Sequence, residues 1–475
     1  MSVANKIFTN TLWQVVIRTI NIFIGVFNLA LITRILGQEG FGFYTTIFAF
    51  VQMLMIFADL GLYLSLLREV SAAKTQAQEN KVVNNIFTIR FVASLVMVVL
   101  APIVIQAFPY SQEVKTGVIY FILAFFFQSL ISTLTAVFSK KLAMPKVAVT
   151  DLFNKIIYLA LIYYLFTKSG SLNQVLLAQT IVNFLTFILF YKFLRHYVKL
   201  RLAWDFAYWR HVWKYTWPLA VTVVLNLIYF KADTLVLSGF RDAAEVGLYG
   251  APYRVLEVLT TFPHMFMSLI LPLFTAAWIA KNFDKLKNTL QHTFDFFSML
   301  TILMIVGTWL ISKPLMIMLA GAEFAGSGPI LNILVVATAS IFFGTLFTYL
   351  VVALRLQKKM IKFFLIAAVV GLIGYFIFIP QFSYWAAAYT TLAIEVLIAI
   401  FACFLVKKYW AFKLNYYVML KSLLAGFVTL AVLWSFKDFN IFLTAILAVI
   451  IYALILILTR AVSKDLIKEV FKRPS

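Results

Sequence analysis

One face of the apolar segment 12–33 carries polar and small residues at helical spacing. They stand at steps of four, three, four and three residues: Gln14, Arg18, Asn21, Gly25 and Asn28. At about 100° per residue these positions share one narrow arc of an α-helix, and the rest of its surface is apolar. A guanidinium and three amides in apolar surroundings need water, a protein partner or a ligand. The pattern favours ligand recognition, with helix packing through small and amide residues as the alternative.

A similar polar stripe occurs 205 residues further along the sequence. Segment 213–237 carries a second stripe of Pro218, Thr222, Asn226, Tyr229 and Asp233. The offset pairs Asn21 with Asn226, Asn28 with Asp233, and the sequence FGFY at 41–44 with VGLY at 246–249. It also pairs Gln52 with Glu257, and Asp59 with His264. The sequence therefore predicts an internal parallel repeat.

The segments that follow each copy carry stripes of their own. These are Thr45, Gln52 and Asp59 in the first copy, and Gly250, Arg254, Glu257, Thr261, His264 and Ser268 in the second. Guanidinium and carboxylate groups on these faces weaken the interpretation as simple packing. Our hypothesis is that the four striped segments face one another across a hydrated cavity between two lobes.

The elements that position these residues are predicted to be membrane-spanning helices. Hydrophobic residues make up 63% of the 475 residues and charged ones 12%, whereas soluble domains are typically about 45–50% apolar and about 25% charged. Runs of span length give fourteen candidates, at 12–33, 41–66, 84–108, 117–138, 147–166, 173–194, 213–237, 246–278, 291–312, 328–354, 362–380, 384–406, 416–436 and 440–460.

Basic residues alternate from loop to loop along these spans. With the N-terminus inside, 28 of the 40 Lys and Arg residues fall in inward loops and tails and 6 in outward ones, which leaves 6 within spans. Such a bias follows the positive-inside rule and predicts that both termini are cytoplasmic. The net charge of +22 is therefore explained by the basic residues of the inward loops, and no nucleic-acid partner is expected.

These patterns predict an all-α integral membrane protein of about 14 transmembrane helices. Residues 1–200 form an N-lobe of six helices and residues 213–410 a C-lobe of six. Residues 414–475 add two helices and a basic cytoplasmic tail. No secretory signal peptide is evident, because the first apolar segment has span length.

The residues at the end of the first stripe resemble a known family. The sequence LITRILG at 31–37, followed by GFGFY at 40–44, DLGL at 59–62 and LRE at 67–69, is similar to the N-terminal signature of the polysaccharide-biosynthesis flippases. VGLY at 246–249 with APYR at 251–254 resembles the second-lobe counterpart. This family contains the O-antigen and capsule repeat-unit flippases of the multidrug/oligosaccharidyl-lipid/polysaccharide exporter superfamily.

The resemblance implies alternating access by two lobes in the bacterial cytoplasmic (inner) membrane. The cargo would be a polyprenyl-diphosphate-linked oligosaccharide, moved from the cytoplasmic to the outer leaflet for cell-surface polysaccharide export. Membrane lipid would hold the polyprenyl tail, and other polysaccharide assembly proteins are conceivable partners. Arginine suits the diphosphate because its planar fork binds phosphate oxygens bidentately, and amides and aromatic rings suit sugar. The candidate substrate-binding residues are Arg18, Asn21, Asn28, Arg90, Asn226, Tyr229, Lys231 and Arg254.

Acidic residues and one histidine are candidates for ion coupling or charge balance: Asp59, Asp233, Glu257 and His264. Two alternatives stay open for the acids: they take up a proton or Na⁺ during the cycle, or they neutralise Arg254 when cargo is absent. Asp151 and Lys155 are interpreted as a structural i,i+4 pair. No other cofactor and no metal are expected, because no His/Cys/carboxylate cluster has metal-ligand spacing.

Two other functions compete with the flippase. A multidrug or organic-cation antiporter of the same superfamily would need an acidic or aromatic cavity, whereas the stripes hold arginines along with their acids. A membrane-embedded polysaccharide polymerase or glycosyltransferase would need catalytic groups in sizeable outward loops, and the outward loops here are short and carry few acids. A transporter is therefore expected in place of an enzyme.

Overall fold

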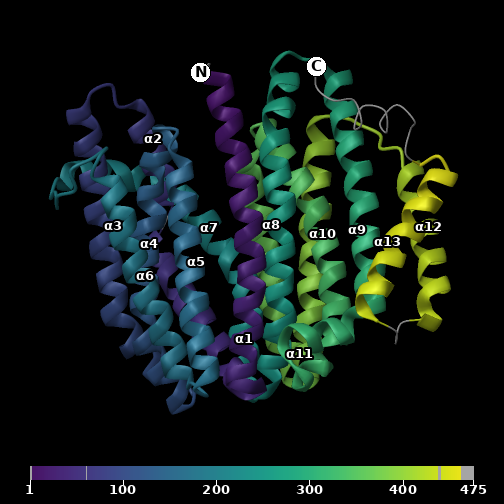
Figure 1. Cartoon of the computed structure of the whole chain (residues 1–475). Helices are drawn as coiled ribbons and strands as arrows, with labels where there is room; N and C mark the ends of the chain where they lie inside the picture. Colours follow the sequence, from purple (N-terminus) through teal and green to yellow (C-terminus); the bar gives the residue numbers. More distant parts are fainter. Residues whose placement is uncertain (1–2, 60, 437–439, 462–475) are drawn as a thin grey trace. The chain divides into compact units, whose positions relative to one another are not determined.

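The computed structural model describes residues 3–59, 61–436 and 440–461. All regular elements within these ranges are helical (Figure 1). They are α1 Val3–Asp59, α2 Leu62–Ala72, α3 Gln76–Val104, α4 Gln112–Lys140, α5 Met144–Thr167, α6 Leu172–Leu194, α7 Phe206–Phe240, α8 Ala243–Ile279, α9 Phe283–Ala320, α10 Ser327–Ala353, α11 Gln357–Tyr409, α12 Tyr417–Leu433 and α13 Ile441–Leu458, with short 3₁₀ turns η1 Ile105–Ala107, η2 Ala322–Gly326 and η3 Trp434–Phe436.

Ten helices in the described ranges are long and apolar enough to cross a membrane. The chain is thus an all-helical, multi-pass membrane protein. Two long helices each contain a break where two spans were predicted: α1 at Gly37 (φ 63°, ψ −173°) and α11 at Ser383 (φ 52°, ψ −138°). Glycine suits the first break because its φ lies where a Cβ would clash. The count of fourteen spans stays a prediction.

The chain forms two compact units. Unit 1 comprises residues 1–250 with 319–321, and unit 2 comprises 251–318 with 322–475. These units are defined by packing, whereas the predicted lobes at 1–200 and 213–410 are defined by the sequence repeat. The lobe boundaries therefore stay a prediction.

Within unit 1, α1 crosses the beginning of α8 at two glycines. A Cβ on Gly42 would lie 1.7 Å from the carbonyl oxygen of Ala243, and a Cβ on Gly247 would lie 2.1 Å from that of Gln38. Gly42 and Gly247 are the equivalent positions of the repeat, so the repeat supplies one glycine to each side of a single crossing. Small residues allow helices to approach closely in a membrane.

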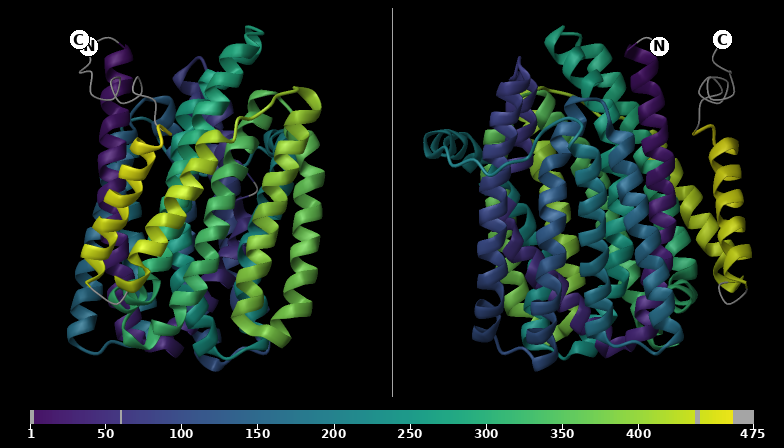
Figure 2. Two further views of the ribbon diagram at one scale, coloured as in Figure 1. Left: turned by 90° about the vertical axis from the view of Figure 1, so that its right-hand side faces the viewer. Right: turned by 60° about the vertical axis from the view of Figure 1, so that its left-hand side comes forward.

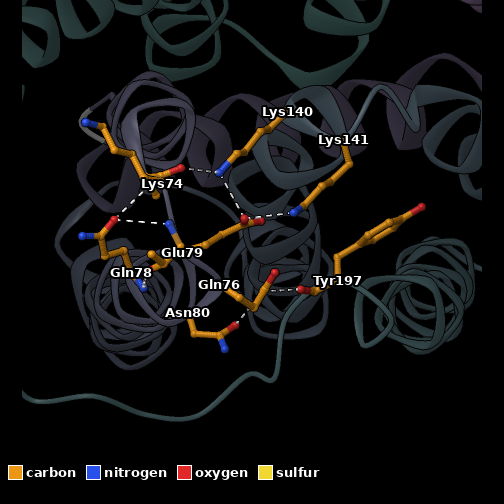
Figure 3. A network of polar contacts seen from close by, with 10 residues as sticks. Lys74, Gln76, Gln78, Glu79, Asn80, Lys140, Lys141 and Tyr197 are labelled. Carbon is orange, nitrogen blue, oxygen red and sulfur yellow. Dashed lines mark hydrogen bonds and ion pairs between the residues drawn. The ribbon is translucent and has the colours of Figure 1, made fainter.

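Unit 1 also holds a buried ion network where α3 begins and α4 ends (Figure 3). Glu79 is 3% exposed, and its Oε2 accepts from Lys140 Nζ at 3.0 Å and Lys141 Nζ at 2.9 Å. Lys140 Nζ also donates to the carbonyl oxygen of Ala73, in the turn between α2 and α3. A carboxylate that faces two ammonium groups is compensated at short range, so the network joins three helices of unit 1.

The connector 195–205 between α6 and α7 is attached to α3 by side-chain acceptors. Asn84 Oδ1 accepts from the Arg201 N–H at 3.0 Å, and Thr88 Oγ1 accepts from the Ala203 N–H at 2.8 Å. The connector ends at Asp205, which caps α7 by accepting from the Tyr208 N–H at 3.0 Å. The segment between the repeats is therefore a strap bound to α3.

The strap is expected to loosen in acid through Asp205. The hydrogen bond from the Tyr208 N–H, and then the bond from Lys81, hold the pKa of Asp205 below its ordinary value. Its carboxylate therefore stabilises the strap above the unfolded pKa, near 3.9, and this is lost as the pH falls through the folded pKa. We expect hydrogen-exchange protection of the Tyr208 amide, corrected for intrinsic exchange, to begin to fall below about pH 5 and to fall further as the pH passes through the lowered folded pKa of Asp205.

The matched variant for this experiment is Asp205→Asn. Asparagine keeps a capping oxygen but carries no titratable charge, so protection in the variant should not change over the same pH range. An equal fall in both proteins would show that another group causes the loosening.

In unit 2, α11 folds into a hairpin at Ser383 (Figure 2, left). Its two halves are joined by a hydrogen bond between the hydroxyls of Tyr375 and Thr391 at 3.1 Å. The helices α12 and α13 pack against α9, where a Cβ on Gly426 would lie 2.8 Å from Ile302 Cγ2 and Tyr452 donates to the Met299 carbonyl at 2.9 Å. The last two helices are thus part of unit 2.

Candidate functional site

A polar cavity lies inside unit 1, among α1, α4, α5 and α6. Its volume is about 370 Å³, within the range of roughly 300–1,000 Å³ that small-molecule sites occupy. Its lining combines amides, one hydroxyl, one carboxylate and one ammonium group with aromatic and aliphatic side chains: Asn21, Phe48, Phe121, Ala124, Phe125, Gln128, Ile131, Asp151, Asn154, Lys155, Gln179, Asn183 and Thr186.

Helical spacing brings the polar side chains of this cavity together. Asp151, Asn154 and Lys155 stand at i, i+3 and i+4 on α5, and Gln179, Asn183 and Thr186 at i, i+4 and i+7 on α6. Each set occupies one face of its helix, and the two helices pack against each other. Because the surrounding sequence is apolar, we expect both faces to turn their polar groups away from lipid.

A hydrogen-bond network joins the polar side chains of α5 and α6 in the cavity lining. Asn154 Nδ2 donates to Asn183 Oδ1 at 2.8 Å and to Thr186 Oγ1 at 3.0 Å. Gln179 Nε2 donates to the same Asn183 oxygen at 3.0 Å, and Asn183 Nδ2 donates to the Ala124 carbonyl at 2.8 Å. Asn183 thus uses both ends of its amide to join α4, α5 and α6.

The sequence interpretation missed most of this cavity. Of the predicted site residues, Asn21 lines it, but the stripes on α5 and α6 were not assigned to a site. The interpretation of Asp151 and Lys155 as a structural pair stays a prediction, and both residues line the cavity. The i,i+3,i+4 spacing on α5 was the available signal.

Several predicted residues on α1 carry buried polar atoms that have no hydrogen-bond partner within the described residues. Asn28 is 4% exposed, and both its amide nitrogen and its oxygen are unpaired. The same holds for Asn21 Oδ1, Thr45 Oγ1 and Gln52 Oε1. An unpaired buried polar group costs about 1–3 kcal/mol, so these atoms are places where water or a ligand would be stabilising. The Arg18 side chain lies outside the described residues.

Asp59 and Arg90 form an ion pair within unit 1. Asp59 Oδ1 lies 3.1 Å from Arg90 Nη1, and the Arg90 side chain is only 4% exposed. Arg90 Nε donates to the carbonyl oxygen of Ser129 at 3.3 Å, and the Ser129 and Ser94 hydroxyls are 2.8 Å apart. The ion pair compensates the charge of the guanidinium inside unit 1, although Arg90 Nη1 and Asp59 Oδ1 are buried without a hydrogen-bond partner in the described part of the chain. The charge pairing favours a structural role for Arg90, and its role in substrate binding stays a prediction.

On α7, two predicted residues are buried among unit 1 side chains. Asp233 is fully buried, and it accepts from the Tyr249 hydroxyl and from the Thr234 N–H, each at 2.6 Å. Lys231 is 6% exposed, and its Nζ lies 5.7 Å from the ring centre of Phe48. Phe48 also lines the cavity. The side chains of Asn226 and Tyr229 lie outside the described residues.

In unit 2, Arg254 and Glu257 form an i,i+3 ion pair on α8. Arg254 Nη1 donates to Glu257 Oε2 at 2.8 Å, and the two side chains are 20% and 26% exposed. His264 lies two turns further along α8, and its carbonyl accepts from the Tyr349 hydroxyl at 3.3 Å. The hydrated cavity that the sequence predicts between the two lobes stays a prediction.

Comparisons with known proteins identify a sequence family for the chain and solved structures with a similar fold. The sequence model of the family described as "Polysaccharide biosynthesis protein" matches residues 7–278. A search of curated protein sequences gives no match.

Solved structures share the fold over 81% to 96% of the chain. The structure titled "Lipid II flippase MurJ, inward closed conformation" is 16% identical with a TM-score of 0.81, and the match covers 96% of this chain and 99% of that one. A multidrug resistance MATE family transporter of the MOP superfamily, in an inward-facing conformation, is 12% identical with a TM-score of 0.66, covering 81% and 94%. A MOP superfamily transporter from Pyrococcus furiosus is 10% identical with a TM-score of 0.59, covering 85% and 95%.

Proposed function

Because the chain belongs to the polysaccharide biosynthesis protein family, we propose that it is a flippase for a polyprenyl-diphosphate-linked oligosaccharide. It moves this lipid from the cytoplasmic to the outer leaflet by alternating access, in the export of cell-surface polysaccharide such as O-antigen. The fold shared with a lipid II flippase and with MOP superfamily transporters supports transport in place of catalysis.

The observation that carries this proposal is the set of unpaired buried polar atoms on α1. Asn21, Asn28, Thr45 and Gln52 each keep at least one such atom without a partner in the described part of the chain. Groups that only pack helices together are satisfied by neighbouring helices, whereas groups that bind a passing polar cargo must be free when the cargo is absent. A head group with hydroxyls and phosphates would supply both donors and acceptors.

The cargo divides naturally among the proposed residues. Arg18 and Arg254 bind the diphosphate, because a guanidinium fork matches phosphate oxygens. The amides of Asn21, Asn28 and Asn226 and the ring of Tyr229 contact the sugar. The polyprenyl tail stays in lipid.

The Arg254–Glu257 ion pair balances the charge of Arg254 during the transport cycle. With cargo absent, Glu257 neutralises Arg254 at 2.8 Å, and the diphosphate replaces the carboxylate when it binds. Glu257, with Asp59, Asp233 and His264, is also a candidate for uptake of a proton or Na⁺. Export measured while the proton gradient and the sodium gradient are collapsed separately distinguishes these roles, because loss in neither condition removes ion coupling.

We expect the Arg18→Ala, Arg254→Ala double variant to lose at least tenfold in surface polysaccharide export at normal membrane levels. Each charge-assisted hydrogen-bond site contributes roughly 1.5–3 kcal/mol, and 1.4 kcal/mol corresponds to a factor of ten. The matched control is Arg241→Ala, because Arg241 pairs with Glu245 on α8 at 3.8 Å and has no proposed role in binding. Normal export from the double variant would overturn the assignment of the two arginines.

The proposal places the chain in the bacterial cytoplasmic membrane with both termini in the cytoplasm, near the other polysaccharide assembly proteins. An organic-cation antiporter is the competing function. Its support is weaker, because the described cavity carries one ammonium group for its one carboxylate and offers a cation no net attraction.

A further inference from the structure

We propose that the cavity among α1, α4, α5 and α6 is a sugar-binding subsite, in which one sugar ring of the lipid-linked head group docks within unit 1. This inference rests on the proposed function and deepens it. It adds residues of α4, α5 and α6 to the substrate-binding residues proposed above, which include Arg18 and Arg254.

The first argument is the balance of charge in the cavity. Its lining contains one carboxylate, Asp151, and one ammonium group, Lys155. A diphosphate would meet the carboxylate at short range and be repelled, and an organic cation would meet the ammonium group. A neutral ligand avoids both penalties and still hydrogen-bonds to each group.

The second argument is the supply of free donors and acceptors. Within the described residues, no hydrogen bond uses the Gln128 amide, and Asn154 and Gln179 each engage only their amide nitrogen. Asn21 adds a buried oxygen without a partner. An apolar tail in this cavity would leave these groups unsatisfied, whereas sugar hydroxyls both donate and accept.

The third argument is the shape of the apolar lining. Phe48, Phe121 and Phe125 contribute aromatic surface beside the amides, and their rings pack against one another, with Phe121 and Phe125 centred 5.4 Å apart in an edge-on arrangement. The C–H faces of a sugar ring fit such a wall while its hydroxyl edge reaches the amides. The volume of about 370 Å³ has room for a ring but not for a long oligosaccharide.

The fourth argument is rigidity. The amide of Asn183 is fixed at both ends, by Asn154 and Gln179 on one side and by the Ala124 carbonyl on the other. A site whose polar groups are already held in place loses less conformational entropy on binding.

The test compares two lipid probes on the purified, full-length protein in nanodiscs. One probe is undecaprenyl diphosphate, and the other is the same lipid carrying N-acetylglucosamine, glucose or galactose. We expect at least one of the three sugar lipids to bind at least threefold more tightly than the bare lipid. We expect Gln128→Leu to remove that difference while it leaves the affinity for the bare lipid unchanged.

The control is Gln112→Leu, which makes the same substitution on α4 outside the cavity lining and should keep the difference. Gln128 is a suitable probe of the cavity because it lines the cavity and its exposed side chain makes no hydrogen bond within the described residues, so its removal leaves no buried group unpaired. Equal binding of the bare lipid and all three sugar lipids, or an unchanged preference in Gln128→Leu, overturns the subsite. Failure of the bare lipid to bind at all would instead count against the proposed function.

Discussion

Replacing Gly42 by alanine is expected to abolish the folded protein or to lower its free energy of unfolding by roughly 3 kcal/mol or more. The new Cβ would lie 1.7 Å from the carbonyl oxygen of Ala243. That atom belongs to the backbone and cannot rotate away, so α1 and α8 must separate at their crossing. Gly247→Ala should behave in the same way, because its Cβ would lie 2.1 Å from the Gln38 carbonyl.

The measurement is the amount of monodisperse protein after detergent extraction, followed by its thermal melting. The matched control is Gly239→Ala on α7, where an added Cβ meets nothing within 4 Å. This control should melt at or slightly above the temperature of the unmodified protein, because alanine favours a helix by up to about 1 kcal/mol over glycine. If Gly42→Ala melts like the control, the crossing is looser than the structure has it.

Asp59→Asn is expected to destabilise unit 1 by roughly 2–3 kcal/mol, because it leaves the buried Arg90 cation without its carboxylate. Removal of one partner of a buried pair typically costs about 3–5 kcal/mol. The smaller value applies here because the Asp59 side chain is 37% exposed and water screens its charge. Arg90→Met should be destabilising as well.

A double-mutant cycle separates the ion pair from other effects of each change. The Asp59→Asn, Arg90→Met variant should recover most of the lost stability, since no unpaired charge remains. We also expect surface polysaccharide export to recover with it, as a structural role for Arg90 requires. Recovered stability without recovered export would instead assign a role in transport to Asp59, as a candidate for ion coupling, or to Arg90, as a candidate for substrate binding.

The cavity of unit 1 shows why part of the candidate site was not predictable from the sequence. Asp151 and Lys155 stand four residues apart, and this spacing alone fits a self-sufficient ion pair. Asn183 and Gln179 are single amides in an apolar helix, and such residues more often join helices than bind ligands. That they line one cavity became visible only in the tertiary structure, where α5 and α6 pack together beside α1.

The two glycines of the α1–α8 crossing were paired by the sequence repeat, but their contacts could not be predicted from it. Gly42 and Gly247 were recognised as equivalent positions of a repeat, 205 residues apart. The repeat paired the two positions but did not indicate that each glycine contacts the other's helix. Contact between residues so distant in sequence depends on the crossing of α1 and α8, which local periodicity does not encode.

The sequence by itself determined that the protein is an all-helical membrane protein and indicated its family, but the count of fourteen spans stays a prediction. Apolar runs and the period of 3.6 residues act within one segment, so the long helices and the polar stripe on α1 could be predicted from neighbouring residues. The tertiary structure decided which polar groups are satisfied and which stay free. Arg90 is paired with Asp59, whereas Asn21 and Asn28 keep unpaired buried atoms within the described residues. That distinction depends on which helices pack together, because hydrogen bonds and ion pairs form only over a few ångströms.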